Sequence, residues 1–323
     1  MTARADSSSG VQCGRPLVRD WSWVLWRLMR RTGIRLQTYL QVARVALFAL
    51  VAIIITGSLV RLTGSGLGCV DWPACNEERF VDVSSGHAAI EQVNRLFTGV
   101  VAASVIAAVL VALAIRPRIP RLIWLSVGLV AGVLAQVVVG GIVVLTGLNP
   151  WSNMAHFLIS VVLVSGAVAL IHETRRAISG PSLTRPSKRV HLVAWAVIVC
   201  ALTVTVLGTV VTATGPHAGD EDAIRFNLSL SHVVRLHAGA VWVFLAVLVG
   251  IALWVRREGM REFLGPTEIV LAWTLAQGLL GYVQYFSGVP VFLVALHVAG
   301  SIFVWMATLR LALSMVRPIS RTV

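Results

Sequence analysis

The chain has 323 residues, of which 57% are hydrophobic and 13% charged, and its mean hydropathy is +0.83. These values exclude an ordinary water-soluble domain and indicate an integral membrane protein. The net charge of +13 does not require a nucleic-acid partner, because basic residues beside membrane helices orient them and face anionic lipid.

Residues 1–40 contain no uninterrupted apolar run, and arginines flank Trp21, Trp23 and Trp26. We predict a cytoplasmic N-terminal tail that ends in an interfacial amphipathic segment, not a cleaved signal peptide.

Eight apolar runs follow, each long enough for the roughly 20 residues that span a bilayer. An even number of spans puts both termini on one side of the membrane. Only five of the 27 Lys and Arg residues lie at the opposite side, so both termini are expected to be cytoplasmic. The predicted spans are 41–61, 92–115, 122–146, 153–172, 191–213, 230–255, 267–286 and 291–315.

A basic, Ser- and Pro-containing linker at 173–190 divides the spans into two halves, 41–172 and 191–316, with a short C-terminal tail at 317–323. The halves resemble each other: segment 95–99 matches 235–239, although Phe97 stands where the second half has His237. We therefore predict an all-α polytopic membrane protein built as two pseudo-symmetric four-helix bundles, related by an axis along the membrane normal.

Each half also carries a membrane histidine twenty residues after a glutamine: His156 after Gln136, and His297 after Gln277. Histidine inside a membrane is costly and suggests a functional site. His237 lies at a depth similar to that of His297, and two facing imidazoles are the usual protein ligands of a six-coordinate haem. The alternative is that each histidine simply bonds to a neighbouring helix.

Other histidines are weaker candidates. His172 and His191 flank the linker and are expected to be solvated, and His217 lies in an acidic outer loop. His87 could face the site served by His156, or it could be a solvated loop residue.

Glu91 is the unusual acidic residue of the first half, near the outer end of the second span. An unpaired carboxylate is costly there, which suggests proton transfer or substrate binding. Alternatively, it is a helix N-terminal carboxylate paired with Arg95.

The preceding outer loop holds Cys69 and Cys75, six residues apart around a Trp-Pro turn. On an oxidising face they can form a disulfide, either as a structural staple or as a redox pair, whereas Cys13 and Cys200 lack such a partner.

The loop 62–75, the Ile-Glu pair before an Asn-Arg-Leu helix, and the paired membrane histidines resemble the haem A synthase family over about residues 40–315. The resemblance implies an oxidoreductase that converts the C8 methyl group of haem O to the formyl group of haem A, through an alcohol, for terminal oxidase biogenesis. It implies a haem b held by His237 and His297, a haem O site with His156 and Glu91, and a Cys69–Cys75 disulfide. Arg95 and Arg235 are candidate partners of haem propionates, with lipid phosphate as the alternative.

One position departs from the family pattern. Members often have a histidine three residues after the glutamate, where this chain has Asn94. Asparagine is a poor iron ligand, so we expect the substrate haem to be held by His156 alone or also by another group such as His87. The bis-histidine half is then expected to transfer electrons and the first half to carry out the oxidation.

Two other classes fit part of the pattern. A quinol-linked dihaem b-type electron-transfer protein would use the same paired histidines but leaves Glu91 and the cysteine loop unexplained. A transporter would explain the duplication, yet the helices lack the usual Gly/Pro interruptions. Expected partners of a haem A synthase in a bacterial plasma membrane are haem O and lipid, with a haem O-forming prenyltransferase, oxidase assembly factors and a second copy of the chain as further candidates.

Overall fold

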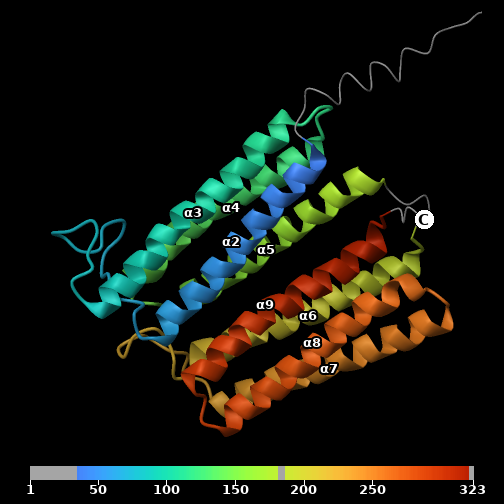
Figure 1. Ribbon diagram of the computed structural model, residues 1–323. Helices are drawn as coiled ribbons and strands as arrows, with labels where there is room; N and C mark the ends of the chain where they lie inside the picture. The colour runs from blue at the N-terminus through green and yellow to red at the C-terminus, as the bar shows by residue number, and fades with distance from the viewer. Residues whose placement is uncertain (1–34, 181–185, 320–323) are drawn as a thin grey trace, which may run out of the picture.

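The computed structural model describes residues 35–180 and 186–319, so the predicted N-terminal tail lies almost entirely outside the described residues. The described chain contains eight long helices (Figure 1), each long and apolar enough to cross a membrane, which confirms the predicted fold class and makes this a multi-pass membrane protein. Large apolar side chains such as Phe48, Trp124 and Phe292 point outward, as expected of a surface that faces lipid. The helices are α2 (Leu36–Leu62), α3 (Gly86–Ala114), α4 (Pro120–Leu145), α5 (Pro150–Ser179), α6 (Lys188–Thr214), α7 (Leu230–Arg257), α8 (Arg261–Phe286) and α9 (Val291–Val316).

Helices α2–α5 and α6–α9 form two four-helix bundles that lie side by side (Figure 1). Consecutive helices pack as antiparallel hairpins, and the fourth helix of each bundle packs against the first. Within the described residues α3 and α5 make no close backbone approach, and neither do α7 and α9, so these pairs stand diagonally across their bundles. We call the end that carries the connections 63–85, 146–149, 215–229 and 287–290 the loop end.

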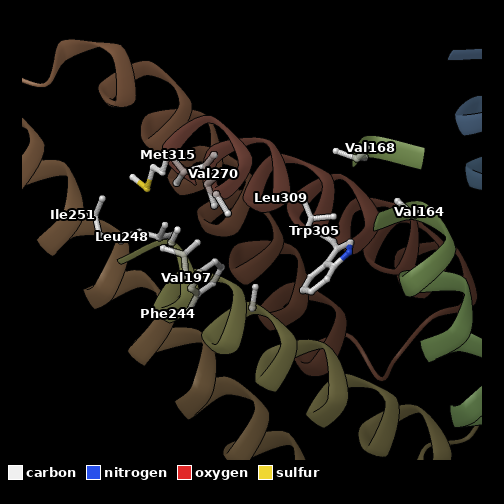
Figure 2. Packing of buried hydrophobic residues seen from close by; sticks show 14 of the residues in the cluster. Val164, Val168, Val197, Phe244, Leu248, Ile251, Val270, Trp305, Leu309 and Met315 are labelled. Carbon is white, nitrogen blue, oxygen red and sulfur yellow. The ribbon is translucent and has the colours of Figure 1, made fainter. Parts of the chain in front are cut away.

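The two bundles join through equivalent helices. Helix α9 packs against both α5 and α2, and α5 also packs against α6, as a two-fold pseudo-symmetry requires. Figure 2 shows this contact, where Val164 and Val168 of α5 lie near Trp305 and Leu309 of α9. The indole nitrogen of Trp305 donates to Ser165 Oγ at 2.9 Å. Since lipid is as apolar as these side chains, close packing and hydrogen bonds stabilise the junction more than the hydrophobic effect does.

Charged residues extend α5 beyond the predicted span and shorten the predicted linker to the region between Ser179 and Lys188. Glu173 is buried and lies 2.7 Å from Arg317, 3.3 Å from Arg121 and 3.5 Å from Arg176, so the carboxylate is paired at the end of the helix. The neighbouring His172 is half-buried and bonds to the carbonyl oxygen of Arg317, so the expectation that it is solvated was wrong.

Candidate functional site

The second bundle brings two histidines together from diagonal helices. The ring centroids of His237 on α7 and His297 on α9 lie 6.4 Å apart, with ring planes at 74°. Two imidazoles bound to opposite sides of one metal ion, with bonds of about 2 Å and ring centres about 1 Å beyond, have centroids about 6 Å apart. Nδ1 of His237 lies 3.1 Å from the carbonyl oxygen of Val204. An N–H donated there leaves Nε2 as the metal-binding atom.

The donor set fits a metal held mainly by a macrocycle. Among the described residues no group of three or more His, Cys, Asp or Glu side chains could hold a metal ion. The pair alone is therefore two ligands short of a tetrahedral zinc site, whereas a haem supplies four ligands itself and needs two from the protein. Nδ1 of His297 is buried without a hydrogen-bond partner in the described chain. The pair fits axial ligation of a haem.

A glycine of the preceding helix lies against each membrane histidine. A Cβ added at Gly208 would lie 3.2 Å from Cε1 of His237, and one added at Gly281 would lie 3.2 Å from Cε1 of His297. In the first bundle a Cβ at Gly140 would lie 3.3 Å from Cε1 of His156. A larger residue at these positions would press on the imidazole, so the glycines make room for it.

His156 on α5 is supported by Gln136 of α4. The Gln136 amide donates to the carbonyl oxygen of His156 at 3.0 Å and also bonds to Ser160. The spacing that links Gln136 to His156 thus reflects a contact across the α4–α5 hairpin. Nδ1 of His156 is buried and has no partner within the described residues, as in His297.

Asn94 and His87, which were predicted to share the substrate haem site with His156, lie in two different places. Asn94 accepts a hydrogen bond from Thr56 of α2 at 2.8 Å. His87 is exposed at the start of α3, with Nδ1 2.9 Å from Ser65 Oγ, so it belongs to the loop and not to the bundle interior.

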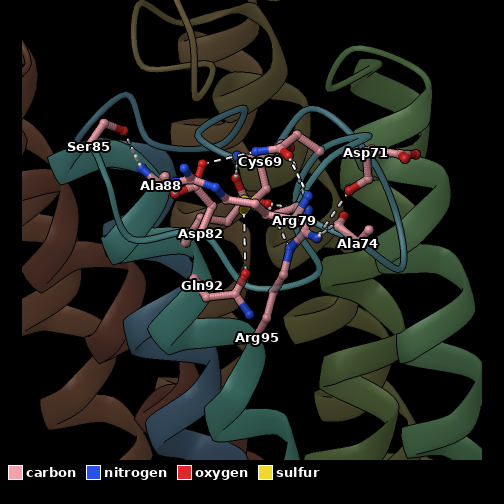
Figure 3. The surroundings of a disulfide bond; sticks show 12 residues. Cys69, Asp71, Ala74, Arg79, Asp82, Ser85, Ala88, Gln92 and Arg95 are labelled. Carbon is pink, nitrogen blue, oxygen red and sulfur yellow. Dashed lines mark hydrogen bonds and ion pairs between the residues drawn. A yellow bond between two sulfur atoms is a disulfide. The ribbon is translucent and has the colours of Figure 1, made fainter.

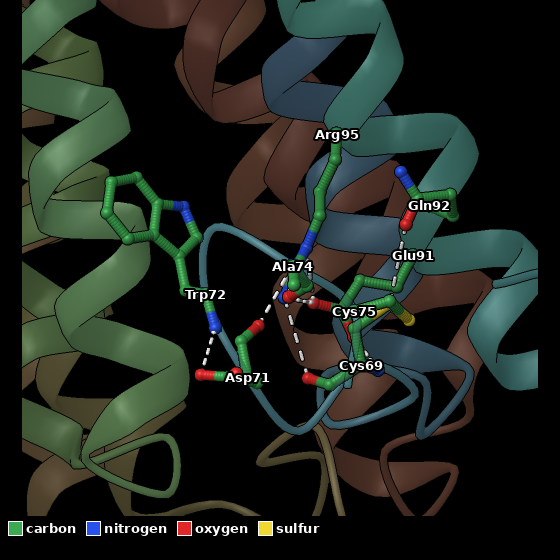
Figure 4. Close-up of polar contacts among 8 residues, drawn as sticks. All are labelled: Cys69, Asp71, Trp72, Ala74, Cys75, Glu91, Gln92 and Arg95. Carbon is green, nitrogen blue, oxygen red and sulfur yellow. Dashed lines mark hydrogen bonds and ion pairs between the residues drawn. A yellow bond between two sulfur atoms is a disulfide. The ribbon is translucent and has the colours of Figure 1, made fainter. Parts of the chain in front are cut away.

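Glu91 is paired with Arg95, which was one of the two alternatives that the sequence left open. It is 5% exposed, and its Oε1 lies 2.6 Å from Nη2 of Arg95 one turn later on α3. Its Oε2 accepts the backbone N–H of Cys69 at 2.7 Å. The Arg95 guanidinium also donates to the carbonyl oxygens of Asp71 and Ala74, both at 3.1 Å (Figures 3 and 4). Arg95 is therefore occupied by the loop and the carboxylate.

Cys69 and Cys75 are disulfide-bonded and buried. The loop they close is also fastened to α4, because a Cβ at Gly141 would lie 2.6 Å from the indole of Trp72. In Figure 4 the Trp72 side chain points away from Arg95, on the other side of the loop. The loop is thus anchored on α3 by a charge pair and on α4 by an aromatic contact. It lies at the loop end of the first bundle, where Trp72 packs against Gly141, the residue after Gly140.

Comparison with known proteins agrees with this arrangement. The family model for cytochrome oxidase assembly protein (COX15-CtaA) matches residues 41–86 and 80–219, which is more than half of the chain. The chain belongs to this family. It is also 26% identical over 262 residues to a heme A synthase from Bacillus pumilus, covering 75% of this chain and 81% of that protein. A heme A synthase from Geobacillus kaustophilus is 35% identical over 130 residues, 39% of this chain and 40% of that relative.

Several contacts in this member of the cytochrome oxidase assembly protein family were not expected from the sequence. Arg61 donates from α2 to the carbonyl oxygens of Thr212 and His217, so it ties the two bundles together at the loop end. His217 itself is half-buried and bonds to the carbonyl of Val289 at 2.8 Å, so this residue of the acidic loop is tied to the connection 287–290. Arg235 is exposed and forms no ion pair in the described part of the chain.

Proposed function

We propose that the protein is a haem A synthase, which oxidises the C8 methyl group of haem O to the formyl group of haem A through an alcohol. The observation that carries the proposal is a difference between two bundles of equivalent fold. One presents a facing pair, His237 and His297, whereas the other has a single histidine, His156, opposite Gly140 and a disulfide-closed loop at the same end. Family membership and the names of the matched relatives support the same reaction.

Conversion of a methyl to a formyl group adds one oxygen atom and removes four electrons. Written with water as the oxygen source, R–CH3 + H2O gives R–CHO + 4 H+ + 4 e−, so the reaction requires an electron acceptor and a proton acceptor. A bound haem supplies the electron chemistry. His237 and His297 would hold a haem b in the second bundle, with residues 191–316 as the electron-transfer half. A haem held by two histidines of the protein would supply electron transfer there and would not bind substrate.

The first bundle, residues 41–172, would bind haem O through His156. Glu91 is the buried carboxylate at the loop end of this bundle, so it is the proposed proton acceptor, a role that requires hydrogen-bond reach of the reacting group. Of the two arginines predicted to pair with haem propionates, Arg95 is already bound to Glu91 and the loop. Arg235 is exposed and is therefore the better candidate for such a pair.

The proposed setting is a bacterial plasma membrane with both termini in the cytoplasm and the Cys69–Cys75 loop outside. The bias of Lys and Arg toward the terminal side supports this orientation. A disulfide also persists more readily on the oxidising side of the membrane. A haem O-forming prenyltransferase, oxidase assembly factors and a second copy of this chain are the candidate partners.

Pigment extraction tests the proposal. The protein is produced in a membrane that makes haem O but no haem A, purified, and its pigments are separated by chromatography. Haem b together with haem O or haem A is the expected result. Haem b alone would favour a dihaem electron-transfer protein, and an absence of pigment would favour a transporter.

A further inference from the structure

The four helical hairpins share one geometry near the loop end. In each hairpin a glycine lies five or six residues before the end of the first helix: Gly57, Gly140, Gly208 and Gly281. The side chain that faces this glycine comes from the second helix, six to eight residues after its first residue. At a rise of 1.5 Å per residue, these side chains lie about 9–12 Å inside the loop end. They are His156, His237, His297 and, opposite Gly57, Asn94.

Asn94 therefore occupies the fourth histidine position of the duplicated fold. A Cβ at Gly57 would lie 3.7 Å from Nδ2 of Asn94, so Asn94 faces this glycine as the imidazoles face the other three, but in a looser contact than their 3.2–3.3 Å. Phe97, which the sequence match places opposite His237, is eleven residues into α3, or about 16 Å from the loop end. Its side chain packs against the core of the first bundle, which includes Val101. The sequence-based pairing of Phe97 with His237 is therefore wrong in space.

The Asn94 side chain is also held in a way that opposes metal binding. Its Oδ1 accepts the hydroxyl of Thr56 at 2.8 Å, and its amide nitrogen is a donor that faces Gly57. No other histidine replaces it among the described residues of the first bundle. His87 is exposed and bonded to Ser65, and His172 lies at the opposite end of α5.

We propose that the first bundle binds its haem through His156 alone, and that Asn94 leaves the opposite face of the iron open to a small exogenous ligand. The site would thus differ from the His237–His297 site in having one histidine ligand instead of two, with Asn94 in the place of the second. This inference rests on the proposed function only in requiring that the first bundle binds a haem.

Carbon monoxide is the probe. Purified full-length protein is loaded with haem, and electron paramagnetic resonance spectra of the oxidised protein count high-spin and low-spin ferric haem. The protein is then reduced and titrated with carbon monoxide, and optical spectra follow the binding. The wild type is expected to contain one low-spin haem that does not bind carbon monoxide and one high-spin haem that does. Asn94→His is expected to abolish carbon monoxide binding and to add a second low-spin signal. Asn94→Ala should keep the reactive haem, and His156→Ala should lose it.

Phe97→His is the matched control, because it places an imidazole three residues away on the same helix, and it should leave carbon monoxide binding intact. A wild-type protein with two low-spin, unreactive haems would overturn the inference while leaving the proposed function standing. Loss of carbon monoxide binding in Phe97→His but not in Asn94→His would also overturn it. A wild type in which the first bundle takes up no haem would overturn both proposals.

Discussion

The carboxylate of Glu91 and the guanidinium of Arg95 lie 2.6 Å apart, and both bind the backbone of the same disulfide-closed loop. The pair therefore holds the loop on α3, whether or not the carboxylate also accepts protons. Substitutions at the two positions can separate these roles.

Glu91→Gln keeps an oxygen that can accept the Cys69 N–H but removes the basic carboxylate. We expect haem A formation to fall on the order of a hundredfold, as for loss of a general base, with haem O accumulating and the His237–His297 haem spectrum unchanged. Arg95→Lys keeps a cation beside Glu91 and should retain most activity. Chromatography of extracted haems measures both. Equal loss in the two variants would mean that Glu91 acts only by holding the loop.

Removal of the disulfide should loosen the loop without unfolding the bundles. Cys69 and Cys75 close a short loop, so the chain-entropy model gives a stabilisation of about 2 kcal/mol. Cys69→Ser/Cys75→Ser is expected to lower the thermal unfolding midpoint slightly and to speed tryptic cleavage at the exposed Arg79. Cleavage at the wild-type rate would show that Glu91, Arg95 and Trp72 suffice to hold the loop.

The contact between Trp72 and α4 can be tested with a pair of glycine variants. A Cβ at Gly141 would lie 2.6 Å from the indole, whereas one at Gly128 in the same helix meets nothing within 4 Å. Gly141→Ala should displace Trp72 and make the disulfide more accessible to a thiol reductant. Gly128→Ala should leave the reduction rate unchanged. Similar rates in both variants would rule out the aromatic anchor.

A second glycine pair tests the histidine pocket. Gly281→Ala puts a Cβ 3.2 Å from His297 Cε1, while Gly278→Ala one turn earlier meets only Val241, at 3.9 Å. Alanine usually stabilises a helix over glycine by about 0.5–1 kcal/mol, so Gly278→Ala should be neutral or stabilising. Gly281→Ala should shift the low-spin haem band and weaken haem retention. Identical spectra for the two variants would contradict a tight contact between position 281 and the His297 imidazole.

The charge cluster at the opposite end of α5 should contribute measurably to stability. Glu173→Gln leaves three arginines without their carboxylate in a setting where the glutamate side chain is 8% exposed. Since the arginines are partly solvated, we expect a loss of about 1–3 kcal/mol, less than for a fully buried pair. Glu268→Gln, which breaks the exposed pair with Arg256, is the control and should be near neutral. Thermal unfolding in detergent at low and high salt compares them.

Hydropathy was sufficient to predict the eight helices, because a membrane-spanning segment needs a long apolar run whatever it packs against. Helix ends were less predictable. Helix α3 begins at Gly86 and not at 92, because Ser85 caps it by accepting the N–H of Ala88. Helix α5 continues past 172 because Glu173 is paired.

The candidate site was predictable where a repeat in sequence corresponds to a repeat in space, as for His156 and His297. It was not predictable at Asn94, since the rotation of α3 about its axis decides whether Asn94 or Phe97 faces Gly57. The loop anchors were also missed. Contacts such as Trp72 with Gly141 join distant segments and leave no periodic signal in the sequence.

Helices α5 and α9 pack directly against each other, and they carry His156 and His297 at the same depth. Packed helices have axes about 8–10 Å apart. An electron leaving a group bound at one histidine would cross a single helix–helix contact to reach the other, a distance suited to tunnelling. With a haem held at each histidine, as proposed, the duplicated architecture would join the two haems by fixed spacing, without a mobile carrier or a domain movement between them.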